Sequence, residues 1–171
     1  ELLNNVLKVK PGKEEAGIYE REVESLLSAL FYSDLTNPSA QHNIHEGRKR
    51  IDITYTNMAV GGFFRWVATH YPAARVFIEC KNYSGEIANN ELDQISSRFS
   101  PSRGRVGIIV CRKFKNKPLF LQRCQDTAKD ERGYVIALYD DDLKALVRCK
   151  KESTDWLSWP LLKERFESLI D

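Results

Sequence analysis

Three short apolar runs do most to constrain the fold of this 171-residue chain. They are "RVFIEC" (Arg75 to Cys80), "RVGIIVC" (Arg105 to Cys111) and "GYVIALY" (Gly133 to Tyr139). Each has the length of a strand, and the last two are apolar without alternation, which is typical of strands covered on both faces. Helix-like segments separate the runs. The order predicts an α/β fold with a central mixed β-sheet flanked by helices.

Other segments fill in this outline. The alternation of Ile51, Ile53 and Tyr55 in "KRIDITYT" predicts an earlier, half-buried strand. The start of the chain is interpreted as a polar lead-in, and "NPSAQHN" is expected to interrupt the regular structure. Apolar spacing and capping residues predict helices over about 16–32, 59–71, 90–99, 119–129, 140–148 and 156–170, the second of them a short helix or a packed insertion.

Composition suits one globular domain over residues 1–171, with 42% hydrophobic and 29% charged residues. Because Met58 is the only methionine, we expect this domain to belong to a longer protein. No apolar run has membrane-spanning length and no signal peptide is seen, so a cytoplasmic protein without a membrane partner is expected. The cysteines lack CxxC spacing and are interpreted as reduced: Cys80, Cys111, Cys124 and Cys149.

Two charges stand at the end of the strand that begins at Arg75. Since side chains alternate across a strand, Glu79 and Lys81 project from one face, and Cys80 projects from the other. On the earlier strand, Asp52 is out of phase with Ile51 and Ile53 and faces away from the side that they bury. If the two strands pair, Asp52 and Glu79 converge at one end of the sheet.

Two converging carboxylates and a lysine suggest a particular chemistry. Carboxylates are hard ligands that suit Mg²⁺ or Mn²⁺. An adjacent ammonium group can neutralise charge on an attacked phosphate, or orient or deprotonate a water molecule, as metal-assisted phosphodiester hydrolysis requires. A third carboxylate, Glu20, lies nearest the centre of the apolar stripe of its helix, where an acid needs a partner. It is favoured over Glu24 as the third metal ligand.

These carboxylates and the lysine resemble the motif of a known family. Glu20 in "GIYEREVESLL", Asp52 in "RKRIDITY" and Glu79-Cys80-Lys81 in "FIECKNY" resemble the PD-(D/E)XK nuclease superfamily, especially Mrr-like restriction endonucleases and Holliday-junction resolvases. The resemblance implies a restriction-endonuclease-like fold. It also assigns metal ligation to Glu20, Asp52 and Glu79, and catalytic help to Lys81.

The resemblance extends over most of the chain, with two departures. The stretches "NNELDQISSRFS", "RVGIIVCRKF" and "GYVIALYDDDLKALV" are similar to the elements that follow this motif, and Gln94 stands where related nucleases often keep a polar residue. No proline precedes Asp52. The span from Asp52 to Glu79 is long, which suggests an insertion that helps to choose the substrate.

Candidate nucleic-acid contacts surround the motif. Basic segments that run from Arg48 to Arg50 and from Arg98 to Lys117 offer charge for phosphate contacts, with Arg48, Arg50 and Arg103 as candidates. A solvated rim is the alternative for such charges. Asn82 and Tyr83, directly after Lys81, either contact a phosphate or base or form the turn before Ser84 and Gly85.

Several similar features have simpler interpretations. The triplet Asp142-Leu143-Lys144 also has the E-x-K form and is interpreted as an ordinary helix start. His42 and His45 lack a further zinc ligand nearby and are interpreted as part of a polar loop. An aromatic group is interpreted as core rather than as a stacking platform for bases: Phe63, Phe64 and Trp66.

The sequence therefore predicts a Mg²⁺-dependent (or Mn²⁺-dependent) DNA endonuclease domain of a prokaryotic restriction or defence protein. The expected partner is double-stranded DNA, and cutting both strands calls for a homodimer or for paired domains of a longer chain. One alternative is a structure-selective repair or recombination nuclease. Another is a nucleic-acid-binding module that has lost catalysis, or an E-x-K pair that is only a surface ion pair.

Overall fold

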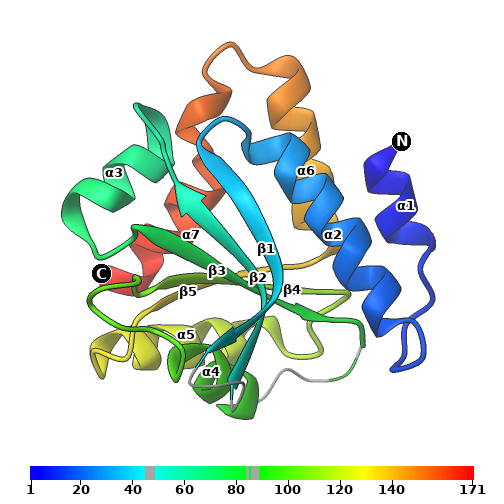
Figure 1. Cartoon of the computed structure of the whole chain (residues 1–171), viewed down its shortest axis with the longest axis horizontal. Helices are drawn as coiled ribbons and strands as arrows, with labels where there is room; N and C mark the ends of the chain where they lie inside the picture. The colour runs from blue at the N-terminus through cyan, green and yellow to red at the C-terminus, as the bar shows by residue number, and fades with distance from the viewer. Residues whose placement is uncertain (45–48, 84, 86–88) are drawn as a thin grey trace.

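The computed structural model describes residues 1–44, 49–83, 85 and 89–171, and side chains outside 41–50. Within them a mixed sheet has the strand order β1-β2-β3-β4-β5 (Figure 1). The first three strands are antiparallel neighbours, and β3, β4 and β5 are parallel. The strands are β1 (Leu35–Ile44), β2 (Lys49–Asn57), β3 (Arg75–Lys81), β4 (Val106–Cys111) and β5 (Tyr134–Leu138).

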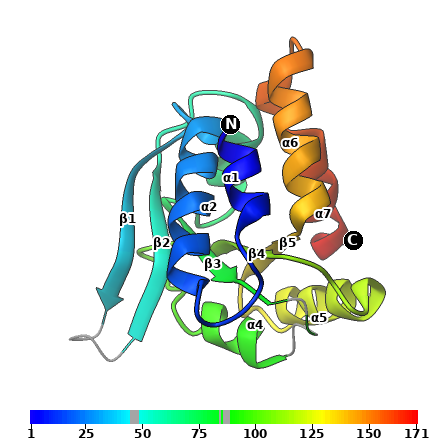
Figure 2. The ribbon, with the colours of Figure 1, turned by 90° about the vertical axis from the view of Figure 1, so that its right-hand side faces the viewer.

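Helices cover both faces of this sheet. In Figure 2, α4 and α5 lie below the sheet, and α1, α2 and α6 lie above it. The predicted α/β class, with a mixed sheet flanked by helices, is thus confirmed. The helices are α1 (Leu2–Lys8), α2 (Ala16–Phe31), α3 (Gly62–His70), α4 (Asn89–Ser96), α5 (Lys117–Lys129), α6 (Asp140–Glu152) and α7 (Pro160–Ile170), with a 3₁₀ turn, η1 (Trp156–Ser158), before α7.

Two hydrophobic cores follow from alternation along the strands. Val76 and Ile78 of β3 belong to the larger core, with the apolar faces of α2, α3, α6 and α7. The smaller core joins α4 and α5 to the other face of β4 and β5, where Ile109 is buried. Phe77 of β3 is absent from the larger core and packs near Phe99, after α4. Glu79 and Lys81, which share the phase of Phe77, therefore face the α4 side.

Two elements differ from the sequence prediction. The stretch "NPSAQHN" lies within β1, at the edge of the sheet, rather than in a break. An edge strand tolerates Pro38 because one side of its backbone has no strand to pair with, and the pairing with β2 shifts register between Thr36 and Ser39. The expected polar lead-in contains α1, whose Val6 is fully buried in the larger core.

The prediction for the aromatic group holds. Phe63 and Phe64 are buried in the larger core and Trp66 packs against it, so the aromatic group is core. All four cysteines are free. Among the helices of the described residues, none is long and apolar enough to cross a membrane.

Candidate active site

The candidate site lies where β2 separates from β3. Their backbone pairing runs from Thr56 opposite Arg75 to Ile53 opposite Ile78. One residue further, the carboxylate of Asp52 replaces a backbone acceptor, because its Oδ2 accepts a hydrogen bond from the Cys80 N–H at 2.8 Å. The two strands are thus joined at this end by a side chain.

This separation corrects one detail of the sequence interpretation. Alternation predicted that Ile51 and Ile53 bury the same side of β2. Ile53 lies in the larger core, but Ile51 packs in a separate small cluster with Phe77. β2 keeps its register with β1 across Asp52, so the difference arises on the other side, where the pairing with β3 ends at Ile53. Asp52 itself is 7% exposed, so its carboxylate sits within the wall of the site rather than on the surface.

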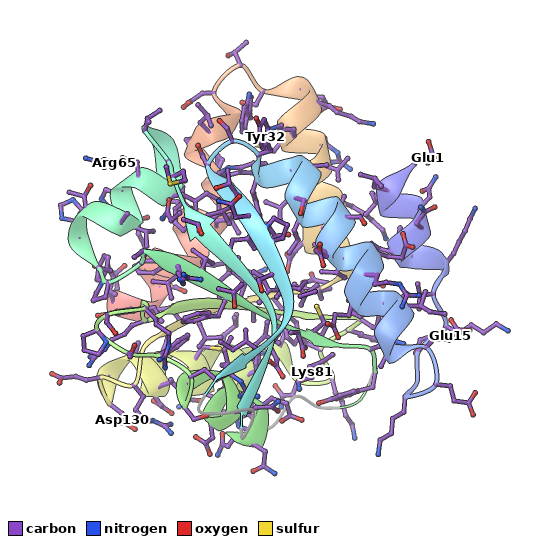
Figure 3. The ribbon with its side chains drawn as sticks, viewed as in Figure 1. Glu1, Glu15, Tyr32, Arg65, Lys81 and Asp130 are labelled. Carbon is purple, nitrogen blue, oxygen red and sulfur yellow. The ribbon has the colours of Figure 1, made fainter. Side chains whose placement is uncertain are left out.

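Glu79, Lys81 and Gln94 form a closed group of polar contacts on the α4 side of β3. The Lys81 ammonium lies 2.9 Å from Glu79 Oε1 and 3.2 Å from Gln94 Oε1. The Gln94 amide donates to Glu79 Oε1 at 2.7 Å. Gln94 comes from α4, so the predicted helix residue does reach the E-x-K pair. Figure 3 labels Lys81, which lies at the lower edge of the sheet in that view.

Glu79 carries an unsatisfied oxygen. The residue is 1% exposed, and its Oε2 has no hydrogen-bond partner among the described residues. Burial raises the pKa of Glu79, and the nearby charge of Asp52 raises it further, while Lys81 and Arg98 oppose the rise. The two carboxylates are therefore close enough to repel each other. A cation bound between them would relieve this repulsion.

Glu20 is buried on the inner face of α2. It is 8% exposed, within the apolar stripe that includes Tyr19 and Val23, whereas Glu24 is only half-buried. Burial raises the pKa of the Cys80 thiol, and the charges of Asp52, Glu20 and Glu79 raise it further. The charges of all three predicted carboxylates therefore act on Cys80 of β3.

These carboxylates do not form a ready-made metal cluster. Among the described residues, no group of three or more His, Cys, Asp or Glu side chains has the arrangement to hold a metal ion. Asp52 and Glu79 are the pair that best fits a hard divalent cation, since both are carboxylates and Glu79 Oε2 is buried without a partner. Glu20, whose charge also acts on Cys80, is the third candidate.

Two of the predicted nucleic-acid contact residues, Asn82 and Tyr83, form hydrogen bonds within the protein. Asn82 is 4% exposed, and its amide donates to the backbone carbonyls of Lys10 (2.9 Å) and Gly12 (3.0 Å). Tyr83 donates its hydroxyl hydrogen bond to Glu91 of α4. Both residues thus make contacts within the protein beside the site, and the chain after Tyr83 continues through positions of which 84 and 86–88 lie outside the described residues.

The predicted arginines are less close to the site, or are not described. The backbone carbonyl of Arg103 accepts the N–H of Arg75, so Arg103 lies at the start of β3, away from Lys81. Its guanidinium donates to the Arg98 carbonyl at 3.0 Å. Arg48 and His45 lie outside the described residues, and the side chains of Arg50 and His42 are not described either.

Sequence reasoning missed the support beneath Gln94. Arg98, just after α4, is 6% exposed, and its guanidinium donates to the Gln94 carbonyl. This contact joins two residues four positions apart at the end of α4, and the positive charge of Arg98 acts on Glu79. Arg98 was seen only as part of a basic segment. Its position three residues after the buried Ile95 offered a weak signal that it points inward.

Comparisons of the chain with protein-family models, with curated proteins and with solved structures find no match.

Proposed function

We propose that this chain is a metal-dependent DNA endonuclease with a restriction-endonuclease-like fold, acting as the cleavage domain of a prokaryotic restriction or antiviral defence protein. The observation that carries the proposal is the pair of buried carboxylates, Glu79 and Asp52, with the partly exposed Lys81 in an ion pair with Glu79. Burying like charges costs stability unless a partner compensates. Perturbed, partly unsatisfied carboxylates of this kind are concentrated at functional sites.

The residues fit a divalent cation. Asp52 and Glu79 would hold Mg²⁺ or Mn²⁺, with Glu20 as a further ligand, and all three offer the hard oxygen donors that these ions prefer. The Glu79 Oε2 atom, buried without a partner among the described residues, is the clearest single donor. When bound, the cation would supply Lewis-acid polarisation of the phosphate and help to activate water.

Side chains of the protein would supply charge neutralisation and orientation. Lys81, with 15% of its side chain exposed, can neutralise a phosphate oxygen or orient the attacking water. Gln94 holds Lys81 and Glu79 through opposite ends of one amide, which fixes their relative position. Asp52 also accepts the Cys80 N–H, so the strand end and the carboxylate are oriented together.

The fold and the order of the motif support the assignment. A buried helix acid, a strand Asp and an E-x-K strand end follow one another in the chain, and the charges of Glu20, Asp52 and Glu79 all act on Cys80. Hydrolysis of both strands of a duplex would need two such sites. We therefore propose that a homodimer, or pairing with further domains of a longer cytoplasmic protein, delivers the double-strand cut.

The test is cleavage of supercoiled plasmid DNA in Mg²⁺ or Mn²⁺ by the wild type and by Lys81→Ala. We expect nicking or linearisation by the wild type and a loss of about 100-fold or more in the variant, as for removal of a charge-stabilising group. The matched control is Lys144→Ala, which removes an exposed lysine from the similar triplet in α6. It should cleave like the wild type.

The other outcomes would either contradict the proposal or favour an alternative function. Equal cleavage by the wild type and Lys81→Ala would contradict the proposal. Cleavage of junctions or single strands only, still lost in Lys81→Ala, would assign a structure-selective nuclease. DNA binding without any cleavage would favour a binding module that has lost catalysis.

A further inference from the structure

The N-terminal segment is fastened to the sheet edge that carries the candidate site. Asn82, directly after Lys81, donates two hydrogen bonds from its amide to the carbonyls of Lys10 and Gly12. Its own backbone carbonyl accepts the Gly12 N–H at 2.7 Å. Three hydrogen bonds thus hold residues 10–12 beside the end of β3.

A second tie comes from the neighbouring strand. Arg112 follows Cys111 of β4, which pairs with Lys81 across the parallel strands. The Arg112 guanidinium donates to the carbonyls of Val6 (2.8 Å) and Leu7 (3.2 Å) at the end of α1 and forms an ion pair with Asp140 at 3.3 Å. The ends of β3 and β4 therefore both hold α1 and the segment after it.

These ties bring two lysine pairs to one edge. Lys10 lies in the fastened segment 10–12 and Lys13 directly follows it, while Lys113 and Lys115 lie in the loop that leaves β4 next to Lys81. All four are exposed, and within the described part of the chain no side-chain hydrogen bond or ion pair engages them. In Figure 3, Glu15 is labelled at the right of the view and Lys81 at the lower centre.

Most of the aspartates near this edge form ion pairs. Asp140 pairs with Arg112, Asp141 pairs with Lys144, and Asp142 pairs with Arg165 inside the protein. Glu14 and Glu15 follow the fastened segment and keep their charge, since the partner of Glu15 is a neutral backbone N–H. The four lysines exceed these two glutamates, so the surface beside the site keeps an excess of positive charge.

We propose that Lys10, Lys13, Lys113 and Lys115 bind the phosphate backbone of double-stranded DNA and seat it beside the candidate active site. The proposal rests on the proposed nuclease function. Lysines without internal partners suit phosphate contacts because an ammonium group attracts a phosphate as a point charge and does not read the base sequence. Asn82 would then serve DNA binding indirectly, by positioning Lys10 and Lys13.

The test is binding of a short fluorescent duplex, measured by anisotropy in EDTA over a series of salt concentrations. Each double variant, Lys10→Ala/Lys13→Ala or Lys113→Ala/Lys115→Ala, should weaken binding and reduce the slope of log K against log salt by about 2, close to one unit per lost contact. The control Arg148→Ala/Lys151→Ala neutralises two exposed cations of α6 and should keep the wild-type slope.

Binding in EDTA does not depend on cleavage, so the two proposals fail separately. Unchanged slopes in both lysine variants would overturn the surface, even if the Lys81→Ala comparison establishes a nuclease. Flattened slopes without plasmid cleavage would support the surface and count against the nuclease. No duplex binding by the wild type, or an equal loss in the Arg148→Ala/Lys151→Ala control, would also overturn the surface.

Discussion

Glu79 is a carboxylate residue held in a buried position that disfavours its charged form. It is nearly fully buried, has Asp52 as a neighbour and keeps one oxygen without a hydrogen-bond partner among the described residues. Lys81, Gln94 and Arg98 compensate only in part, since the pKa of Glu79 is still raised. A structural residue would gain nothing from this arrangement, whereas a cation ligand gains a preformed position.

The raised pKa of Glu79 makes a prediction about stability and pH. A carboxyl group whose folded pKa exceeds its ordinary value of 4.5 stabilises the fold at lower pH, and this contribution is lost as the pH rises through the folded pKa. Glu79→Gln does not titrate. In chelator, the free energy of unfolding of Glu79→Gln should therefore rise relative to that of the wild type as the pH increases above the ordinary value of 4.5, until the folded wild-type carboxyl is ionised.

Urea unfolding of both proteins across this range measures the difference. The comparison of slopes with pH is more informative than the absolute values, because the new amide leaves a buried N–H to satisfy. A difference that is constant with pH would show that Glu79 ionises as it does in the unfolded chain.

At the scale of elements, the site depends on the separation of β2 from β3 and on the position of α4. The patterns in the sequence predicted β2 to β5 and most of the helices, because each carries apolar residues at its own period. β1 was missed because Asn37 and Pro38 are typical of turns, and an edge strand can accept them where pairing with one neighbour suffices.

Long-range ties could not be predicted from local patterns. Asn82 and Lys10 are 72 residues apart in the chain, and Arg112 and Val6 are 106 apart. A polar residue after a strand has the same local signature whether it contacts a ligand or another segment. Asp52, Glu79 and Gln94 could be brought together in advance only because strand phase and the resemblance to a nuclease motif both pointed to them.

The tie made by Asn82 gives a prediction for one element. Asn82→Ala removes two hydrogen bonds to the segment after α1, which should cost about 1–3 kcal/mol and increase hydrogen exchange in residues 2–12. Asn116→Ala is a matched control, since it removes the N-cap hydrogen bond of α5. It should cost about 1 kcal/mol without changing exchange near α1. Equal exchange near α1 in both variants would argue against the tie.

At the scale of the molecule, the topology of the sheet places the residues of the candidate site at the same end of neighbouring strands. Parallel β3, β4 and β5 end on the same side, so the residues after each strand lie near one another. The antiparallel β2 adds Asp52 to this edge from the opposite direction. The candidate site and the proposed DNA surface are therefore neighbours because of the topology, although their residues are scattered along the chain.

The most direct test of the central claim is calorimetric titration of Mn²⁺ into the DNA-free protein. We predict saturable Mn²⁺ binding by the wild type. This binding should be lost or much weakened in Asp52→Asn. It should be retained in Lys81→Ala, since the lysine is not a metal ligand. The Glu20→Gln and Glu24→Gln pair adds a comparison, with only the former expected to weaken binding. Binding by Asp52→Asn equal to that of the wild type, or no binding by the wild type, would contradict the assignment of these carboxylates as a metal site.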